Sequence, residues 1–323
     1  MIYAAEGAEL LSVTPVRVKQ LLKEIRGDEP PKETYGRVRI GPDEMAKLIK
    51  LRGLTYKKTI ATIGMEKGGI GKSLLTINVA MRKAQTGAKV LIIDLDPEAC
   101  ATNFLIPDAA ANSGSFVTML EIFKDRRLTF SDAAIPTGIG GLDIVPCKGK
   151  ARRVDKFIRD DNLSNLMHKR LGDLSRYDLV LFEVPPTFTN IISMAYMASD
   201  LIVMPTFPDA WSLESILLTI EDVTEACHEW ATKIPEMKIL LNKYNPTRRA
   251  SVDAWGVLTR DFGDKVLPFQ IPERADIQNS INEGKSVWEI GSPKVVKDAL
   301  DQLAHYILPL ESLNNLVSNE ITQ

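Results

Sequence analysis

The chain has 323 residues, of which 45% are hydrophobic and 25% charged, a composition typical of globular proteins with roughly two domains. This composition excludes a mainly disordered protein, and the formal net charge of -2 excludes a general attraction of the whole molecule to nucleic acid or anionic membranes. Three single cysteines, Cys100, Cys147 and Cys227, argue against a disulfide framework, a zinc site and a cysteine-bound cluster. No apolar run reaches the roughly 18 to 20 residues that span a bilayer, so we expect a cytoplasmic protein.

The start of the chain differs from the rest in charge and pattern. Residues 1–58 hold 12 Lys/Arg and 8 Asp/Glu, so this part carries +4 and the remainder carries -6. The pattern predicts, in chain order, a helix over residues 5–11, a second helix over residues 15–25 capped by Thr14, a strand over residues 37–40 and a third helix that ends at Leu51. We therefore expect a small basic domain over residues 1–55.

Residues 5–22, AEGAELLSVTPVRVKQLL, resemble a MerR-like helix-turn-helix, with residues 35–40 as its wing. The resemblance implies that a recognition helix and a wing contact DNA through basic side chains, namely Arg17, Lys19, Lys23, Arg37 and Arg39. From the residues alone, the alternative is a small helical oligomerisation module with a solvated basic face.

From residue 59 onward, short apolar runs alternate with amphipathic stretches. The expected strands cover residues 59–64, 89–94, 142–145, 178–184, 201–205, 238–241 and 266–271, and helices are expected over residues 73–85, 211–230 and 247–262. Strands buried on both faces that alternate with helices indicate an α/β fold with a doubly wound, mainly parallel sheet, which we assign to residues 56–323. Ligands of such sheets bind at the carboxyl ends of the strands.

The most informative segment is KGGIGKS, residues 67–73, which lies between an expected strand and an expected helix. Glycines let the backbone turn its N–H groups toward a phosphate, and the helix N-terminus adds a positive dipole. Lys72 then contacts the β- and γ-phosphates and Ser73 offers a hydroxyl to Mg²⁺. The segment therefore predicts a nucleoside triphosphate site formed by Lys67, Gly68, Gly69, Ile70, Gly71, Lys72, Ser73 and Leu74.

In this loop Glu66 stands where the standard loop has glycine, and Lys67 follows it. The segment thus resembles the deviant Walker A family of P-loop ATPases, which includes the ParA partition proteins and MinD. The resemblance implies that Lys67 crosses a dimer interface and touches the phosphates of the partner's nucleotide. The active form would then be a homodimer with ATP sandwiched between the subunits.

Further segments carry the same resemblance. Residues 94–98, DLDPE, match the family's second motif, which implies that Asp94 helps to hold Mg²⁺ and that Asp96 positions the attacking water. Residues 177–186 match the third motif, with Glu183 as a metal residue where the family usually has Asp. Asn242 and Pro272 correspond to positions beside the adenine base. Lys67, Lys72 and Asp96 are the expected catalytic residues of a slow, Mg²⁺-dependent ATPase.

Within the family, the details of residues 94–102 and 242–250 are most similar to the ParA branch. The scattered cysteines disfavour the nitrogenase iron protein and the arsenical-pump ATPases, and residues 311–323 lack the basic membrane helix of MinD. The resemblance implies nucleoid-associated, non-specific DNA binding in the ATP state and a centromere-binding, ParB-like partner that moves a plasmid or chromosome. Candidate DNA contacts in the ATPase body are Arg248, Arg249 and Arg260.

Two other functions stay open from the sequence. The first is an ATP-sensing, sequence-specific transcriptional regulator, and the second is a positioning ATPase for a cargo other than DNA.

Overall fold

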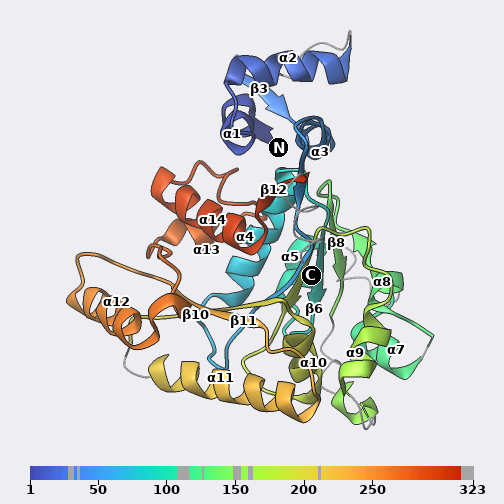
Figure 1. The fold of residues 1–323 in the computed structure, drawn as a ribbon, viewed down its shortest axis with the longest axis vertical. Coiled ribbons are helices and arrows are strands. Elements are labelled where there is room, and N and C mark those ends of the chain that lie inside the picture. Colours follow the sequence, from blue (N-terminus) through green and yellow to red (C-terminus); the bar gives the residue numbers. More distant parts are fainter. Residues whose placement is uncertain are drawn as a thin grey trace.

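The computed structural model describes residues 1–27, 33–34, 37–107, 116–125, 127–147, 154–158, 163–209 and 212–313. Within these residues a seven-stranded sheet forms the centre of the molecule (Figure 1). In spatial order its strands are β11 (Glu236–Leu241), β10 (Leu201–Thr206), β5 (Thr59–Ile63), β9 (Leu179–Glu183), β6 (Val90–Asp94), β8 (Leu142–Val145) and β7 (Ile135–Pro136). All neighbours pair parallel except β7, which runs antiparallel to β8 at one edge. The predicted mainly parallel α/β fold is therefore confirmed.

Alternate residues of each strand enter two separate hydrophobic clusters, one on each face of the sheet, as Ile92 and Ile93 do. The first cluster is completed by α4 (Lys72–Gln85), α5 (Cys100–Leu105), α13 (Ala275–Asn282) and α14 (Lys294–Ile307). The second is completed by α7 (Met119–Lys124), α8 (Phe130–Ala133), α9 (Leu163–Leu171), α10 (Asn190–Ala198), α11 (Ser212–Glu229) and α12 (Arg249–Phe262). Because both faces are covered, the strands have the continuous apolar runs seen in the sequence.

The strand predicted over residues 266–271 is wrong. This stretch makes only isolated bridges, Ile239 with Val266 and Tyr244 with Pro272, beside the edge strand β11. Pro268 and Pro272 lack the backbone N–H that a continuous ladder needs. The stretch therefore runs beside β11 as a loop, and α12 is followed by the short 3₁₀ helix η2 (Gly263–Lys265).

Residues 1–51 are called the N-terminal module, and those that the structure describes form a separate small sheet and three helices. The elements are β1 (Ile2–Tyr3), α1 (Ala4–Leu10), α2 (Pro15–Arg26), β2 (Glu33–Thr34), β3 (Arg37–Ile40) and α3 (Pro42–Leu51). Strand β3 pairs antiparallel with both β1 and β2. The predicted cap of α2 is present, since the Thr14 hydroxyl accepts the N–H of Arg17 at 3.2 Å.

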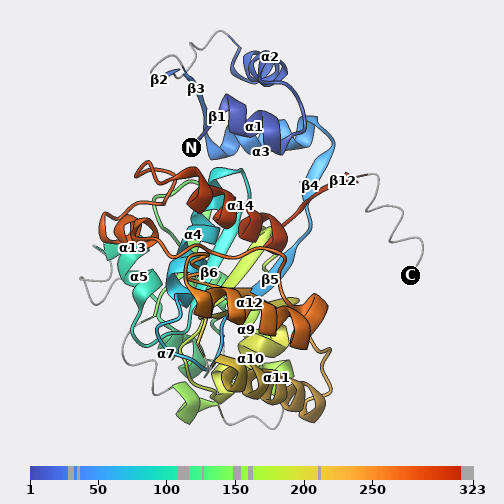
Figure 2. The same ribbon diagram turned by 90° about the vertical axis from the view of Figure 1, so that its left-hand side faces the viewer.

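The N-terminal module packs against the end of the α/β body, residues 56–313, that carries α4 and α14 (Figures 1 and 2). Arg82 of α4 is the central polar contact: its guanidinium binds Asp301 of α14 at 2.5 Å and Glu6 of the module at 3.3 Å. The connection between module and body includes β4 (Leu54–Tyr56), which pairs antiparallel with β12 (Leu310–Ser312). The helix that begins at the phosphate loop thus also contacts the N-terminal module.

Candidate functional site

The glycine-rich loop between β5 and α4 has the backbone that the sequence predicts for a phosphate cradle. Gly69 and Gly71 have φ values of +71° and +89°, in the left-handed region that favours glycine. A Cβ at Gly71 would lie only 2.7 Å from Nδ2 of Asn242, which follows β11. Since Ile70 is fully buried, the loop is anchored in the core of the body.

The two lysines of the loop have different partners. The Nζ of Lys72 donates to the carbonyl oxygen of Lys67 at 2.8 Å, and burial lowers the pKa of Lys72 against the charges of Glu183 and Asp96. The Nζ of Lys67 donates to both carboxylate oxygens of Asp209, each at 2.7 Å. Lys72 therefore stays within the phosphate loop, whereas Lys67 pairs with an acid of its own subunit.

Two buried carboxylates lie side by side next to Ser73. Asp94 and Glu183 are direct register partners at the carboxyl ends of β6 and β9, and the Ser73 hydroxyl donates to Oε1 of Glu183 at 2.5 Å. Burial raises the pKa of Glu183 to about 8, and the neighbouring Asp94 charge adds to this. Burial likewise raises the pKa of Asp94 to about 7. This pair of acids would be stabilised in its charged form by a cation.

The oxygen atoms in this cluster suit Mg²⁺. Oε2 of Glu183 is buried and makes no hydrogen bond among the described residues, so it has a lone pair left for a cation. Carboxylate and hydroxyl oxygens are hard ligands of the kind Mg²⁺ prefers. In the described part of the chain no group of three or more His, Cys, Asp or Glu side chains is placed to hold a metal ion, so Mg²⁺ here would also need Ser73, phosphate oxygens or water.

Asp94 and Asp96 are held by backbone donors. Asp94 accepts the N–H of Asp96 at 3.0 Å and both the N–H and the hydroxyl of Thr102, at 3.0 and 2.7 Å. The carboxylate of Asp96 accepts the N–H of Glu98 at 2.8 Å. The sequence does not indicate Thr102 as a site residue, because nothing in its spacing from Asp94 shows that α5 turns back toward the strand end.

A pocket of about 350 Å³ opens beside the phosphate loop, on the side of β11. Asn242 lines it and donates from Nδ2 to the carbonyl of Ile70 at 2.8 Å, while the N–H of Lys243 donates to Oδ1 of Asn242. The lining residues are Gly69, Gly71, Leu74, Leu75, Asn242, Lys243, Pro272, Glu273, Arg274, Ala275, Ile277 and Gln278. The structure thus brings the predicted residues Leu74, Asn242 and Pro272 together next to the phosphate loop.

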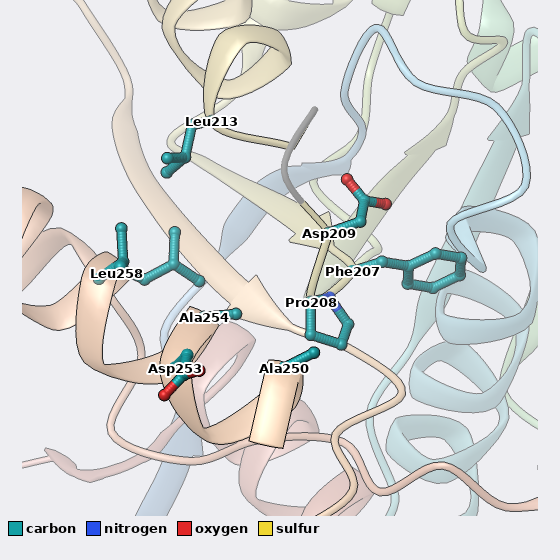
Figure 3. Close-up of a pocket in the computed structure, with 9 residues that line it drawn as sticks. Phe207, Pro208, Asp209, Leu213, Ala250, Asp253, Ala254 and Leu258 are labelled. Atoms are coloured by element: carbon teal, nitrogen blue, oxygen red, sulfur yellow. The ribbon is translucent and has the colours of Figure 1, made fainter. Parts of the chain in front are cut away.

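A second pocket, of about 220 Å³, lies between α11, α12 and the loop after β10 (Figure 3). Its lining is mostly apolar and includes Phe207, Leu213 and Leu258. Asp209 stands at its edge, and the ring of Phe207 points away from Leu213 and Leu258 (Figure 3). Asp209 is therefore both a wall of this pocket and the partner of Lys67. The sequence does not indicate Asp209 as a partner of Lys67, because 142 residues separate them.

Glu66, the unusual residue of the loop, contacts α11. Its backbone N–H donates to the Thr219 hydroxyl at 3.3 Å, and its carboxyl is a neighbour of the Asp222 carboxyl. Burial and this carboxyl neighbour raise the pKa of Glu66 to about 7. The start of the phosphate loop is thus fastened to α11, a contact that the sequence did not indicate.

The predicted DNA-contact residues lie on two surfaces. In the N-terminal module Arg17, Lys19, Lys23 and Arg37 are exposed, and Arg39 is half-buried. In the body, three exposed arginines each pair with a nearby acid, Arg248 with Glu273, Arg249 with Asp253 and Arg260 with Asp261. The three arginines of the body therefore lie in locally balanced charge, and in the module Arg17 also lies 4.0 Å from the carboxylate of Glu24.

Among the described residues, no helix combines the length and apolar character needed to cross a membrane.

Comparisons with known proteins identify the family and the fold. Residues 57–234, more than half of the chain, match the protein-family model described as "AAA domain". The chain is 25% identical to the cell division protein PomZ of Myxococcus xanthus over 94% of this chain and 91% of PomZ. It is 23% identical to the chromosome partitioning protein ParA of Caulobacter vibrioides over 71% of this chain and 85% of ParA. The structure of a Cyanothece McdA variant in complex with ATP superimposes with a TM-score of 0.67 and 21% identity over 77% of this chain and 97% of McdA, which confirms the fold.

Proposed function

The chain belongs to the AAA-domain family as a ParA-type partition ATPase, and on that premise we propose that ATP with Mg²⁺ assembles two copies of it into a DNA-binding dimer. One observation carries the proposal: Lys72, Ser73, Asp94 and Glu183 meet at the strand ends beside the 350 Å³ pocket. Such a constellation suits a nucleotide whose phosphates lie in the loop and whose base lies in the pocket.

The proposed roles of the residues in hydrolysis combine the family resemblance with their places in the structure. Lys72 neutralises charge on the β- and γ-phosphates. Ser73, Asp94 and Glu183 would hold Mg²⁺, which would offset negative charge on the phosphate oxygens. Asp96 orients a water molecule whose oxygen bonds to the γ-phosphorus as the bond to the bridging oxygen breaks. Asn242 and Pro272 border the adenine. Positioning and electrostatics then lower the barrier without a covalent intermediate.

Lys67 makes the site depend on dimerisation. In the proposed sandwich dimer its ammonium reaches the phosphates of the partner subunit's nucleotide, so each active site is complete only when two subunits meet. This arrangement links nucleotide occupancy to association. Because ATP hydrolysis is slow, the ATP-bound dimer is long-lived, and it returns to monomers after hydrolysis.

The basic surfaces supply the proposed DNA contacts. Arg248, Arg249 and Arg260 bind phosphates of any sequence in the ATP dimer, and this binding weakens steeply with salt. The exposed face of α2 and β3 in the N-terminal module acts as a helix-turn-helix with a wing and binds an operator. A centromere-binding, ParB-like protein completes the proposed partition system on the nucleoid.

The test is binding to a random-sequence DNA duplex in the nucleotide-free, ADP and ATP-Mg²⁺ states. We expect salt-sensitive binding only with ATP-Mg²⁺, and its loss in Lys67→Ala and Lys72→Ala. Asp96→Ala should still dimerise and bind DNA but no longer hydrolyse ATP, so unimpaired hydrolysis in that variant would remove its assigned role.

The likeness to PomZ over nearly the whole chain supports a second candidate, a positioning ATPase for another cargo. Random DNA left unbound in all nucleotide states would favour this candidate. If, in addition, one operator is protected and deletion of residues 1–55 abolishes that protection, the chain is instead a sequence-specific regulator.

A further inference from the structure

The loop between β10 and α11 holds the lysine that precedes the phosphate-loop glycines. Lys67 donates to both oxygens of Asp209 at 2.7 Å, and the exposed fractions of these side chains are 21% and 38%. Next to it, the N–H of Glu66 donates to Thr219 of α11 at 3.3 Å. Two consecutive residues of the phosphate loop are thus tied to the same neighbouring segment of their own subunit.

Neighbouring residues hold Asp209 in position for its contact with Lys67. Its backbone N–H donates to the carbonyl of Phe207 at 2.9 Å, which closes a tight turn around Pro208. The ring of Phe207 lies 4.4 Å below the ammonium of Lys243, the residue after Asn242. Figure 3 shows the Asp209 carboxylate turned away from Ala250, which lines the apolar pocket. The turn therefore points the acid toward the phosphate loop, next to the end of the base pocket.

We propose that Asp209 is a positioning residue, an intrasubunit latch that keeps Lys67 away from the dimer interface until ATP is bound. This inference rests on the proposed function, in which Lys67 binds the partner's nucleotide. An ammonium held between two carboxylate oxygens of its own subunit is not available to phosphates across an interface. The triphosphate of ATP carries more negative charge than the diphosphate of ADP, so a partner with ATP draws Lys67 off the latch more strongly than a partner with ADP does.

The size of the effect follows from the exposure of the pair. A partly exposed Lys–Asp pair raises the equilibrium constant for the closed latch, with Lys67 paired, over the open latch by about two- to fivefold. Two latches open for every dimer formed, so loss of both should strengthen dimerisation by about 4- to 25-fold. The latch thus raises the protein concentration at which dimers form, but it does not prevent dimerisation.

The experiment measures the dimer fraction against protein concentration by analytical ultracentrifugation, at saturating non-hydrolysable ATP analogue with Mg²⁺ and without DNA. We expect Asp209→Asn to dimerise at a protein concentration about 4- to 25-fold lower than wild type. Asp209→Glu keeps the charge and should stay close to wild type. Asp253→Asn is the matched control, because Asp253 lines the same pocket but pairs with Arg249.

The decisive comparison is made in the Lys67→Ala background. There Asp209→Asn should have no effect, because the latch has already lost its lysine. Unchanged or weaker dimerisation of Asp209→Asn, in a chain where Lys67→Ala does impair dimerisation, overturns the latch and leaves the proposed function intact. Wild-type dimerisation of Lys67→Ala overturns both.

Discussion

The docking of the N-terminal module on the ATPase body can be tested at a single glycine. Gly87 follows α4 with a φ of +92°, and a Cβ built there would lie 2.6 Å from the backbone N of Ala46 and 3.0 Å from the carbonyl carbon of Met45. Both atoms belong to the backbone of α3, which a side-chain rotation cannot relieve. In Gly87→Ala the left-handed φ costs about 1–2 kcal/mol, and displacing α3 costs about 1–3 kcal/mol more.

The measurement is the free energy of unfolding from urea titrations of the full chain. Gly284→Ala is the control, because Gly284 also follows a helix with a positive φ, +67°, but no atom lies within 4 Å of its added Cβ. It should lose only about 1–2 kcal/mol, whereas Gly87→Ala should lose about 2–5 kcal/mol. Trypsin should also cut faster at Lys57 and Lys58, which follow β4, in Gly87→Ala alone. Equal losses in the two variants would refute the close contact between α3 and the turn after α4.

Three further variants probe other contacts. Asp301→Asn weakens the ion pair of the buried Arg82 and should lower the free energy of unfolding by about 2 kcal/mol. The control is Asp298→Asn at an exposed position of the same helix, which should lower it by less than about 0.5 kcal/mol. Similar losses in the two variants would contradict the role of the pair. The pKa of Glu66 is about 7 in the folded chain and 4.5 in its ordinary state, so wild type should lose stability as the pH rises from about 4.5 to about 7. Glu66→Gln lacks this loss, so the Tm of the variant relative to wild type should rise by about 2 °C over that pH range in thermal unfolding. The gain is modest because the side chain is only partly buried. A Tm difference that stays constant with pH would argue against the acid pair. Asn242→Ala should raise the KM for ATP about tenfold with little change in kcat, and steady-state kinetics that show a lower kcat at constant KM would exclude a base contact.

The local signals of the sequence predicted much of the site. The phosphate loop is recognisable because its function needs left-handed glycines, a lysine and a hydroxyl in consecutive positions before a helix. The strands that end at Asp94 and Glu183 are recognisable because both of their faces are buried, which leaves continuous apolar runs. Helix α2 is recognisable because the Thr14 cap and the proline after it act within one turn.

Other features depend on contacts between segments that are far apart in the sequence. Prolines in and just after residues 266–271 interrupt the ladder, a conflict that the apolar pattern alone does not show. The turn that presents Asp209 to Lys67 depends on where α11 lies against the phosphate loop. The place of the N-terminal module depends on Arg82 and Gly87, which lie on a helix and a turn that belong to the body.

The sequence by itself thus determined the fold class, the phosphate loop and the two aspartates at the end of β6, because each is encoded within a few neighbouring residues. Only the tertiary structure decided the order of the strands, and with it the pairing of Asp94 with Glu183. It also decided the contact of Asn242 with the loop and the partner of Lys67. Such contacts join residues more than 80 positions apart, and their geometry is set by how helices pack on both faces of the sheet, which no local pattern records.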